Sequence, residues 1–111
     1  MAIKERSREE SELVNRIIHA CWPYAELFRI NTGSVKTATG YLFSTGTPAG
    51  FPDICGYRRS DKKMIFIEVK VKPNKPTDKQ TAFIDKVKAA GCPAGVCYSV
   101  EEALAIIRDE K

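Results

Sequence analysis

The sequence predicts a mixed α/β fold, a sheet with helices packed on it in the order α-β-β-β-α-β-α. Three observations lead to this prediction. Apolar residues recur at helical spacing near both ends and after residue 77, runs with alternating apolar and polar residues lie between these segments, and Gly- and Pro-rich turns separate them. At 111 residues the chain is expected to form a single domain over residues 1–111.

The first helix is predicted to run from about Ser7 to Cys21. Ser7 can cap its N-terminus, with Glu10 three positions on completing a capping box, and Trp22-Pro23 ends it. Its apolar stripe consists of Leu13, Val14, Ile17, Ile18 and Cys21.

Strands are expected next, because apolar and polar residues alternate there. The predicted strands are 26–31 (ELFRIN), a possible short strand at 41–44 (YLFS), and two hairpin arms at 51–58 and 63–72. A Gly/Thr-rich loop at 32–40 is expected to precede the short strand, and a turn at 45–50 is expected to follow it.

The second half of the chain predicts two helices around one strand. Thr77 is a good N-cap for the first of them, and Gly91 and Pro93 stop it. Residues 94–99 (AGVCYS) are expected to form a short buried strand. Ser99, followed three positions on by Glu102, opens the last helix. The apolar residues of the two helices are Phe83, Ile84, Val87 and Ala90, then Ala103, Leu104, Ile106 and Ile107.

Positive charge is concentrated in one part of the chain. The net charge is +4, but residues 58–88 hold ten Lys and Arg against four Asp and Glu. Such a segment suits a polyanion such as nucleic acid, and a solvated face is the alternative. No apolar run is long enough to span a membrane, and the N-terminus is too charged for a secretory signal. A cytoplasmic chain without a membrane partner is therefore expected.

The four cysteines indicate neither a zinc site nor a disulfide framework. Cys21, Cys55, Cys92 and Cys97 show no CxxC spacing, and the only histidine is His19. We expect the cysteines to be small buried hydrophobic residues.

Charged residues occupy one face of the predicted hairpin. Strand alternation turns Glu68 and Lys70 to the same side. A two-residue turn at Ser60-Asp61 would pair residues whose numbers sum to 121, which places Asp53 directly opposite Glu68.

Two adjacent carboxylates repel each other, and one is driven to hold a proton unless a cation lies between them. Oxygen ligands of this kind suit Mg²⁺, and the neighbouring lysine could stabilise charge on a phosphate under attack. The alternative is an exposed strand face with an ordinary ion pair between Glu68 and Lys70.

Three motifs together resemble a known family. Gly50-Phe51-Pro52-Asp53, then Glu68-Val69-Lys70, then Gln80 at the start of a helix resemble the VRR-NUC (virus-type replication-repair nuclease) family. That family belongs to the PD-(D/E)XK superfamily, which also contains restriction enzymes and archaeal Holliday junction resolvases. The resemblance implies a restriction-endonuclease-like αβββαβ core with a C-terminal helix.

The resemblance also implies roles for these residues. Asp53 and Glu68, with the backbone carbonyl of Val69, would hold Mg²⁺ or Mn²⁺, and Lys70 would activate or position the attacking water. Gln80 would orient Lys70 or a phosphate. The alternative for Gln80 is a capping box with Thr77, and both roles could hold together.

A glutamate on the first helix would complete the site. Glu9, Glu10 and Glu12 compete for this role. Glu10 is favoured as the catalytic and metal-binding residue because it shares a helix face with Val14, which turns it towards the sheet.

DNA contacts are expected from six cations, which would bind phosphates and read little sequence. They are Lys36, Arg58, Arg59, Lys72, Lys75 and Lys79. No element of the sequence resembles an aromatic stacking platform, and Trp22 and Tyr24 are expected to be core or interface residues.

By resemblance, the protein would be a metal-dependent DNA endonuclease of a phage or bacterial cell. Branched DNA such as a four-way Holliday junction is the expected substrate. A homodimer is expected because one small domain carries one active site, and paired cuts need two. A non-catalytic DNA-binding or assembly module of the same fold is the alternative, and a restriction enzyme or an RNA-cleaving relative would share the chemistry.

Overall fold

A computed structural model describes residues 8–30, 34–36, 42–44 and 47–109. Its centre is a four-stranded mixed sheet in the order β1-β4-β5-β6. The strands are β1 (Ala25–Arg29), β4 (Ile54–Arg58), β5 (Met64–Val69) and β6 (Ala94–Cys97). β1, β4 and β5 are antiparallel neighbours, and β6 runs parallel to β5.

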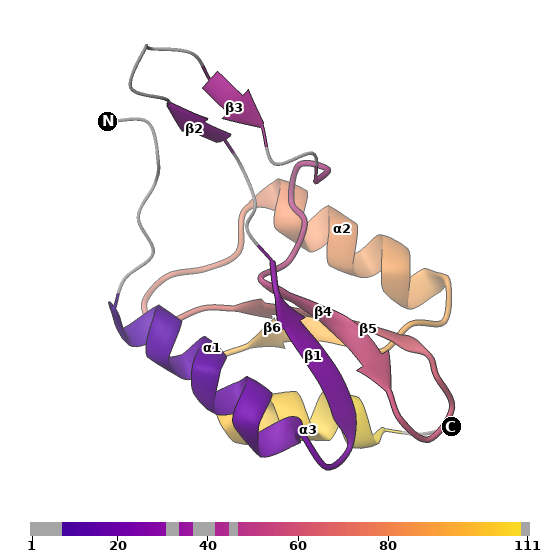
Figure 1. Ribbon diagram of the computed structural model, residues 1–111. Coiled ribbons are helices and arrows are strands. Elements are labelled where there is room, and N and C mark those ends of the chain that lie inside the picture. The colour runs from indigo at the N-terminus through magenta and orange to yellow at the C-terminus, as the bar shows by residue number, and fades with distance from the viewer. Residues whose placement is uncertain (1–7, 31–33, 37–41, 45–46, 110–111) are drawn as a thin grey trace.

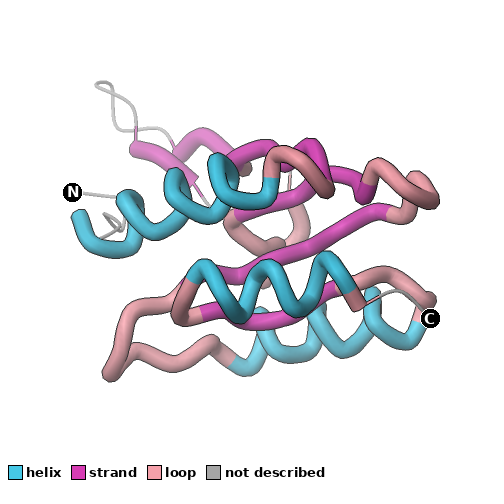
Figure 2. The backbone as a smooth tube through the Cα atoms, turned by 90° about the horizontal axis from the view of Figure 1, so that it is seen from below, coloured by secondary structure: helices cyan, strands magenta, loops and turns pink. Residues whose placement is uncertain are grey.

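Three helices cover the sheet (Figure 1). They are α1 (Arg8–Cys21), α2 (Asp78–Ala89) and α3 (Val100–Arg108). α1 and α3 lie side by side on one face, as the view in Figure 2 shows, and α2 lies on the other. The predicted αβββαβα order is confirmed. None of the helices in the described ranges is long and apolar enough to cross a membrane.

Alternation along β5 divides the core between the two faces. Ile65, Ile67 and Val69 are fully buried in the larger cluster with α1 and α3. Phe66 points the other way, into a smaller cluster with Ile84 of α2. Burial of each large apolar side chain contributes about 1.5–3 kcal/mol, so a one-residue shift of β5 would be costly.

A second, two-stranded sheet consists of β2 (Ser34–Lys36) and β3 (Leu42–Ser44). The short strand predicted at 41–44 is confirmed by β3. β2 lies in the segment 32–40 that was predicted to be a loop, and this prediction was wrong for three residues. Ser34–Lys36 carry no strand pattern of their own, and their extended form depends on antiparallel pairing with β3.

The predicted register of the central hairpin is confirmed. Ile54 pairs with Ile67, and Tyr57 with Met64. The two-residue turn was wrong, because Arg58 N donates to Lys63 O at 2.8 Å and the connection spans residues 59–62. One residue is added on each side of Ser60-Asp61, so the loop widens without shifting the strands.

The helix caps predicted for α2 and α3 are both present. Thr77 Oγ1 accepts a hydrogen bond from Gln80 N, and Ser99 Oγ accepts one from Glu102 N. Gly91 adopts φ +98° after the last turn of α2, which explains its position there. Ser7, the predicted cap of α1, lies outside the described residues.

Candidate active site

The hairpin brings Asp53 and Glu68 together on the α2 side of the sheet. Asp53 directly precedes β4, Glu68 is on β5, and the two residues are only 5% and 2% exposed. Asp53 Oδ2 accepts a hydrogen bond from Val69 N at 2.9 Å. This bond continues the hairpin beyond its last paired residues and fixes one carboxylate beside the other.

The two oxygens of Glu68 have different surroundings. Oε2 accepts a hydrogen bond from Gln80 Nε2 at 3.0 Å and lies 3.4 Å from Lys70 Nζ. Oε1 is buried and, within the described chain, has no hydrogen-bond partner while Glu68 is charged. A buried acceptor without a donor is costly, so Oε1 is the oxygen that a bound cation would satisfy.

Burial, reinforced by the negative charge of Asp53, raises the pKa of Glu68 to about 8. Lys70 opposes this shift with its positive charge. A proton on Glu68 would also form a hydrogen bond with Asp53. The repulsion between the carboxylates of Asp53 and Glu68 must therefore be relieved by either a proton or a cation.

Gln80 forms the predicted capping box and also contacts the candidate active site. Its Oε1 accepts from Thr77 N at 2.8 Å in the capping box, and its Nε2 donates to Glu68. Since Thr77 N can only donate and Glu68 Oε2 accepts, the two partners fix which end of the amide faces the site. Gln80 thus contacts Glu68. It was predicted to orient Lys70, and the two side chains instead share Glu68 Oε2 as a partner.

Gly50 allows the loop before Asp53 to pack closely against the backbone of α2. It adopts φ +82°, and a Cβ at this position would collide with the backbone carbonyl of Lys79. Only glycine allows this close approach. The distance between Asp53 and Gln80 is therefore set by backbone packing as well as by side chains.

Of the three competing glutamates on α1, Glu10 is the least exposed, as expected. Glu9 and Glu12 are exposed, and Glu12 pairs with Arg8 at 3.7 Å. α1 starts at the end of the molecule where β5 finishes (Figures 1 and 2) but packs on the opposite face. Over the described ranges no three His, Cys, Asp or Glu side chains form a group that could hold a metal ion, so a metal role for Glu10 stays a prediction.

The chain matches the family model of the VRR-NUC domain over residues 3–101. It belongs to the VRR-NUC family. A VRR-NUC domain implies a nuclease of the PD-(D/E)XK type, with DNA as partner and usually a divalent metal. A search of curated proteins found no match.

Three of the cations predicted to bind DNA lie on the segment that follows the strand of Glu68 in this VRR-NUC domain. Lys72, Lys75 and Lys79 are exposed on the segment from the end of β5 to the first turn of α2. Lys72 Nζ lies 5.9 Å from the ring centre of Tyr98. The side chain of Lys36 lies outside what the structure describes.

The structure corrects the expectation that Arg58 is displayed at the hairpin tip for contact with DNA. This residue is buried and only 3% exposed. Its side chain shares the α1/α3 face with Ile54. It donates to both carboxylate oxygens of Asp61 and, at 2.9 Å, to the carbonyl of Ile107 at the end of α3. We withdraw Arg58 from the DNA contacts, since its guanidinium neutralises Asp61 and caps a helix.

Arg59 points to the other side of the hairpin and is one-third exposed. Its guanidinium lies 4.3 Å from the ring centre of Trp22 and 3.8 Å from Glu26. Trp22 and Tyr24 are 56% and 40% exposed, so the core alternative for them is wrong. The sequence did not indicate this exposure, because side chains directly after the end of a helix can point into the core or out to solvent.

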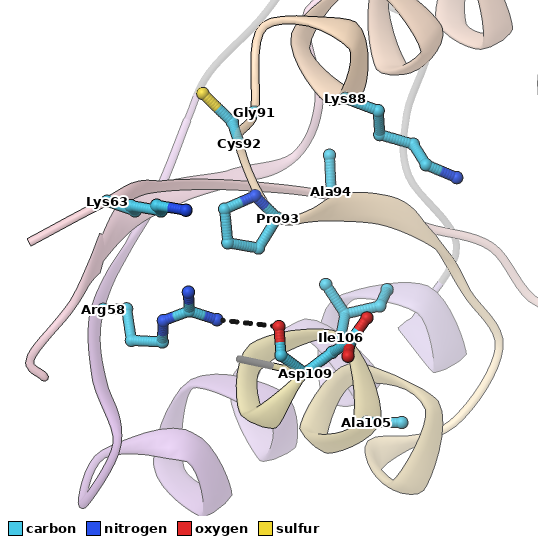
Figure 3. Close-up of a pocket in the computed structure, with 10 residues that line it drawn as sticks. All are labelled: Arg58, Lys63, Lys88, Gly91, Cys92, Pro93, Ala94, Ala105, Ile106 and Asp109. Carbon is cyan, nitrogen blue, oxygen red and sulfur yellow. Dashed lines mark hydrogen bonds between the residues drawn. The ribbon is translucent and has the colours of Figure 1, made fainter. Parts of the chain in front are cut away.

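A cavity of about 600 Å³ lies at the opposite end of the sheet from the carboxylates. Figure 3 shows Arg58 inside it, with a hydrogen bond of 3.4 Å to the carbonyl of Asp109, and Lys63 and Lys88 at its rim. The carboxylates of the candidate active site do not line this cavity.

Proposed function

We propose that this VRR-NUC protein is a metal-dependent DNA endonuclease that hydrolyses phosphodiester bonds. The observation that supports this most is the buried Asp53–Glu68 pair with one unpartnered carboxylate oxygen and a lysine beside it. An ordinary surface ion pair would leave neither carboxylate buried nor the pKa of Glu68 raised.

Asp53, Glu68 and the carbonyl of Val69 are the groups that would hold Mg²⁺ or Mn²⁺, with Glu10 as a further candidate. The all-oxygen donor set fits a hard divalent ion, and Glu68 Oε1 is an acceptor that needs a positive partner. When bound, such an ion supplies a Lewis acid for the phosphate and lowers the pKa of a water.

Lys70 and Gln80 would act on the reacting groups through charge and orientation. Lys70 is largely buried beside Glu68, where its ammonium can stabilise negative charge on a phosphate and position the attacking water. Gln80 would orient Glu68 through the hydrogen bond from its Nε2. The oxygen of the water would form a bond to phosphorus as the water gives up a proton to solvent. The bond from phosphorus to the 3′ oxygen would break, and that oxygen would take up a proton from solvent, leaving 5′-phosphate and 3′-hydroxyl ends.

Branched DNA, in particular a four-way junction, is the proposed substrate, and a homodimer is the proposed active form. Lys72, Lys75 and Lys79 would contact phosphates on the side of the active site, with Lys36 and Arg59 as further contacts. Phosphate contacts do not read sequence, which favours selection by DNA shape. Two copies would be needed for paired cuts because each domain has one site.

A substrate panel tests this proposal. Labelled linear, flap and four-way DNA would be incubated with the protein and Mg²⁺, Mn²⁺ or EDTA, with a sizing column run beside the assay. We expect cleavage of the branched substrates with either metal and none in EDTA. Protein that binds DNA but cuts nothing in either metal would instead support the non-catalytic module.

Gln80→Glu is expected to reduce cleavage about 10- to 100-fold while α2 keeps its cap. Glutamate still accepts from Thr77 N, but it replaces the donor to Glu68 by a third negative charge. Cleavage rates and thermal unfolding should be measured together. Thr77→Val is the matched control, since it removes the cap hydroxyl and costs about 0.5–2 kcal/mol of stability with a smaller effect on cleavage. Equal cleavage by Gln80→Glu and wild type would show that Gln80 acts only as part of the helix cap and has no role in cleavage.

A further inference from the structure

Among the described residues, part of the sheet face that carries the active site is left exposed beside α2. α2 packs against β5 and β6. On β1 and at the start of β5, Phe28 and Met64 are 52% and 49% exposed. We call this surface the open face, and its residues are Glu26, Phe28, Tyr57 and Met64, with Cys55 at its border with the α2 cluster.

The strand register places these residues on one side of the sheet. Phe28 pairs with Cys55, Glu26 with Tyr57, and Tyr57 with Met64. Along β4, Cys55 and Tyr57 alternate with residues of the α1/α3 face and therefore point to the same side as Asp53. The open face is thus continuous with the active site.

Charges at the far end of the open face favour a polyanion. Glu26 accepts a hydrogen bond from Tyr57 at 2.7 Å and lies beside Arg59, so its negative charge is compensated. Arg59 is occupied by Glu26 and by the carbonyl of Trp22, to which its Nε donates at 2.9 Å, and the uncompensated positive charge on this turn comes from Lys62 and Lys63, which are exposed. A second copy of this chain, with its net charge of +4, would be a poorer match in charge than DNA.

We propose that the open face binds unpaired nucleotides of the DNA strand that enters the active site. Exposed aromatic side chains on a sheet suit base stacking, and the exposed Lys62 and Lys63 on the neighbouring turn suit the phosphates. The inference rests on the proposed nuclease function and deepens it. A continuous duplex offers no unstacked base for Phe28 and Tyr57, whereas a branch point or flap does, so this surface selects branched DNA.

Binding of metal-free protein in EDTA tests the proposal independently of cleavage. The anisotropy of a labelled oligothymidylate would give the affinity, and the fluorescence of Trp22, the single tryptophan, would report binding beside Arg59. We expect saturable binding of the single strand with quenching of Trp22, and weaker binding of blunt duplex. Phe28→Ala should weaken single-strand binding roughly 5- to 100-fold, as expected for loss of base stacking.

Two substitutions serve as controls, with folding checked by circular dichroism. Phe28→Tyr keeps an aromatic ring and should bind as wild type. Tyr24→Ala removes an aromatic of similar exposure that lies against Arg108 of α3, on the other face, and should change nothing. Met64→Ala is a second test on the open face and should also weaken binding.

Unchanged single-strand affinity in Phe28→Ala and Met64→Ala would overturn the proposal. If Phe28→Ala instead turned a dimer into a monomer on a sizing column at unchanged affinity, the open face would be an interface between copies, which also overturns it. Single-strand binding without cleavage in any metal would contradict the nuclease function and leave the binding surface standing.

Discussion

Asp53→Asn is expected to lower metal-dependent DNA cleavage by at least about a hundredfold while DNA binding in EDTA is retained. Asparagine keeps the size of the side chain and an oxygen that can accept from Val69 N, so the hairpin should fold unchanged. What it removes is one of the two negative charges available to a divalent ion. Single-turnover cleavage of a four-way junction in Mg²⁺, with binding measured in parallel, would reveal the loss.

Asp85→Asn is the matched control, because Asp85 is an exposed acid on α2. It should cleave and bind as wild type. Retention of full cleavage by Asp53→Asn would remove Asp53 from the proposed metal site and contradict the assignment of both carboxylates to one ion.

Glu68→Gln is expected to stabilise the metal-free protein, and more strongly at pH 8 than at pH 5. Burial beside Asp53 raises the pKa of Glu68 from 4.5 to about 8. Between these values the folded protein holds a proton that the unfolded chain has lost. Its free energy of unfolding therefore decreases as the pH rises, by up to about 1.4 kcal/mol per pH unit. Glutamine carries no such proton and removes this dependence.

Urea unfolding in EDTA at pH 5, 6, 7 and 8 would measure the effect as the difference between variant and wild type. Glu101→Gln, a change at an exposed glutamate in the first turn of α3, should give a difference that does not vary over this range. Added Mn²⁺ should stabilise wild type at pH 8 and not Glu68→Gln, because the ion takes the place of the proton. A constant difference for Glu68→Gln across the pH range would contradict the raised pKa.

Local pattern in the sequence was sufficient for the three helices, for the strands of the main sheet and for the pairing of the two carboxylates, but not for β2. Period-two alternation in β5 decides which residues face each core, and a shift by one residue would expose Ile65 and Ile67. This constraint placed Asp53 opposite Glu68 even though the turn itself is wider than predicted. Caps at Thr77 and Ser99 were equally readable, because capping depends on residues only three positions apart.

Only the tertiary structure decided which charged and aromatic side chains are accessible. Arg58 and Arg59 are neighbours of the same type, yet Arg58 ends β4 and contacts the end of α3, whereas Arg59 begins the turn and lies beside Trp22. The exposure of Phe28 depends on where α2 packs, and the partner of Gln80 depends on how Gly50 docks on that helix. These outcomes require contacts between segments distant in the chain, whereas the helices and the hairpin register follow from residues close together in the sequence.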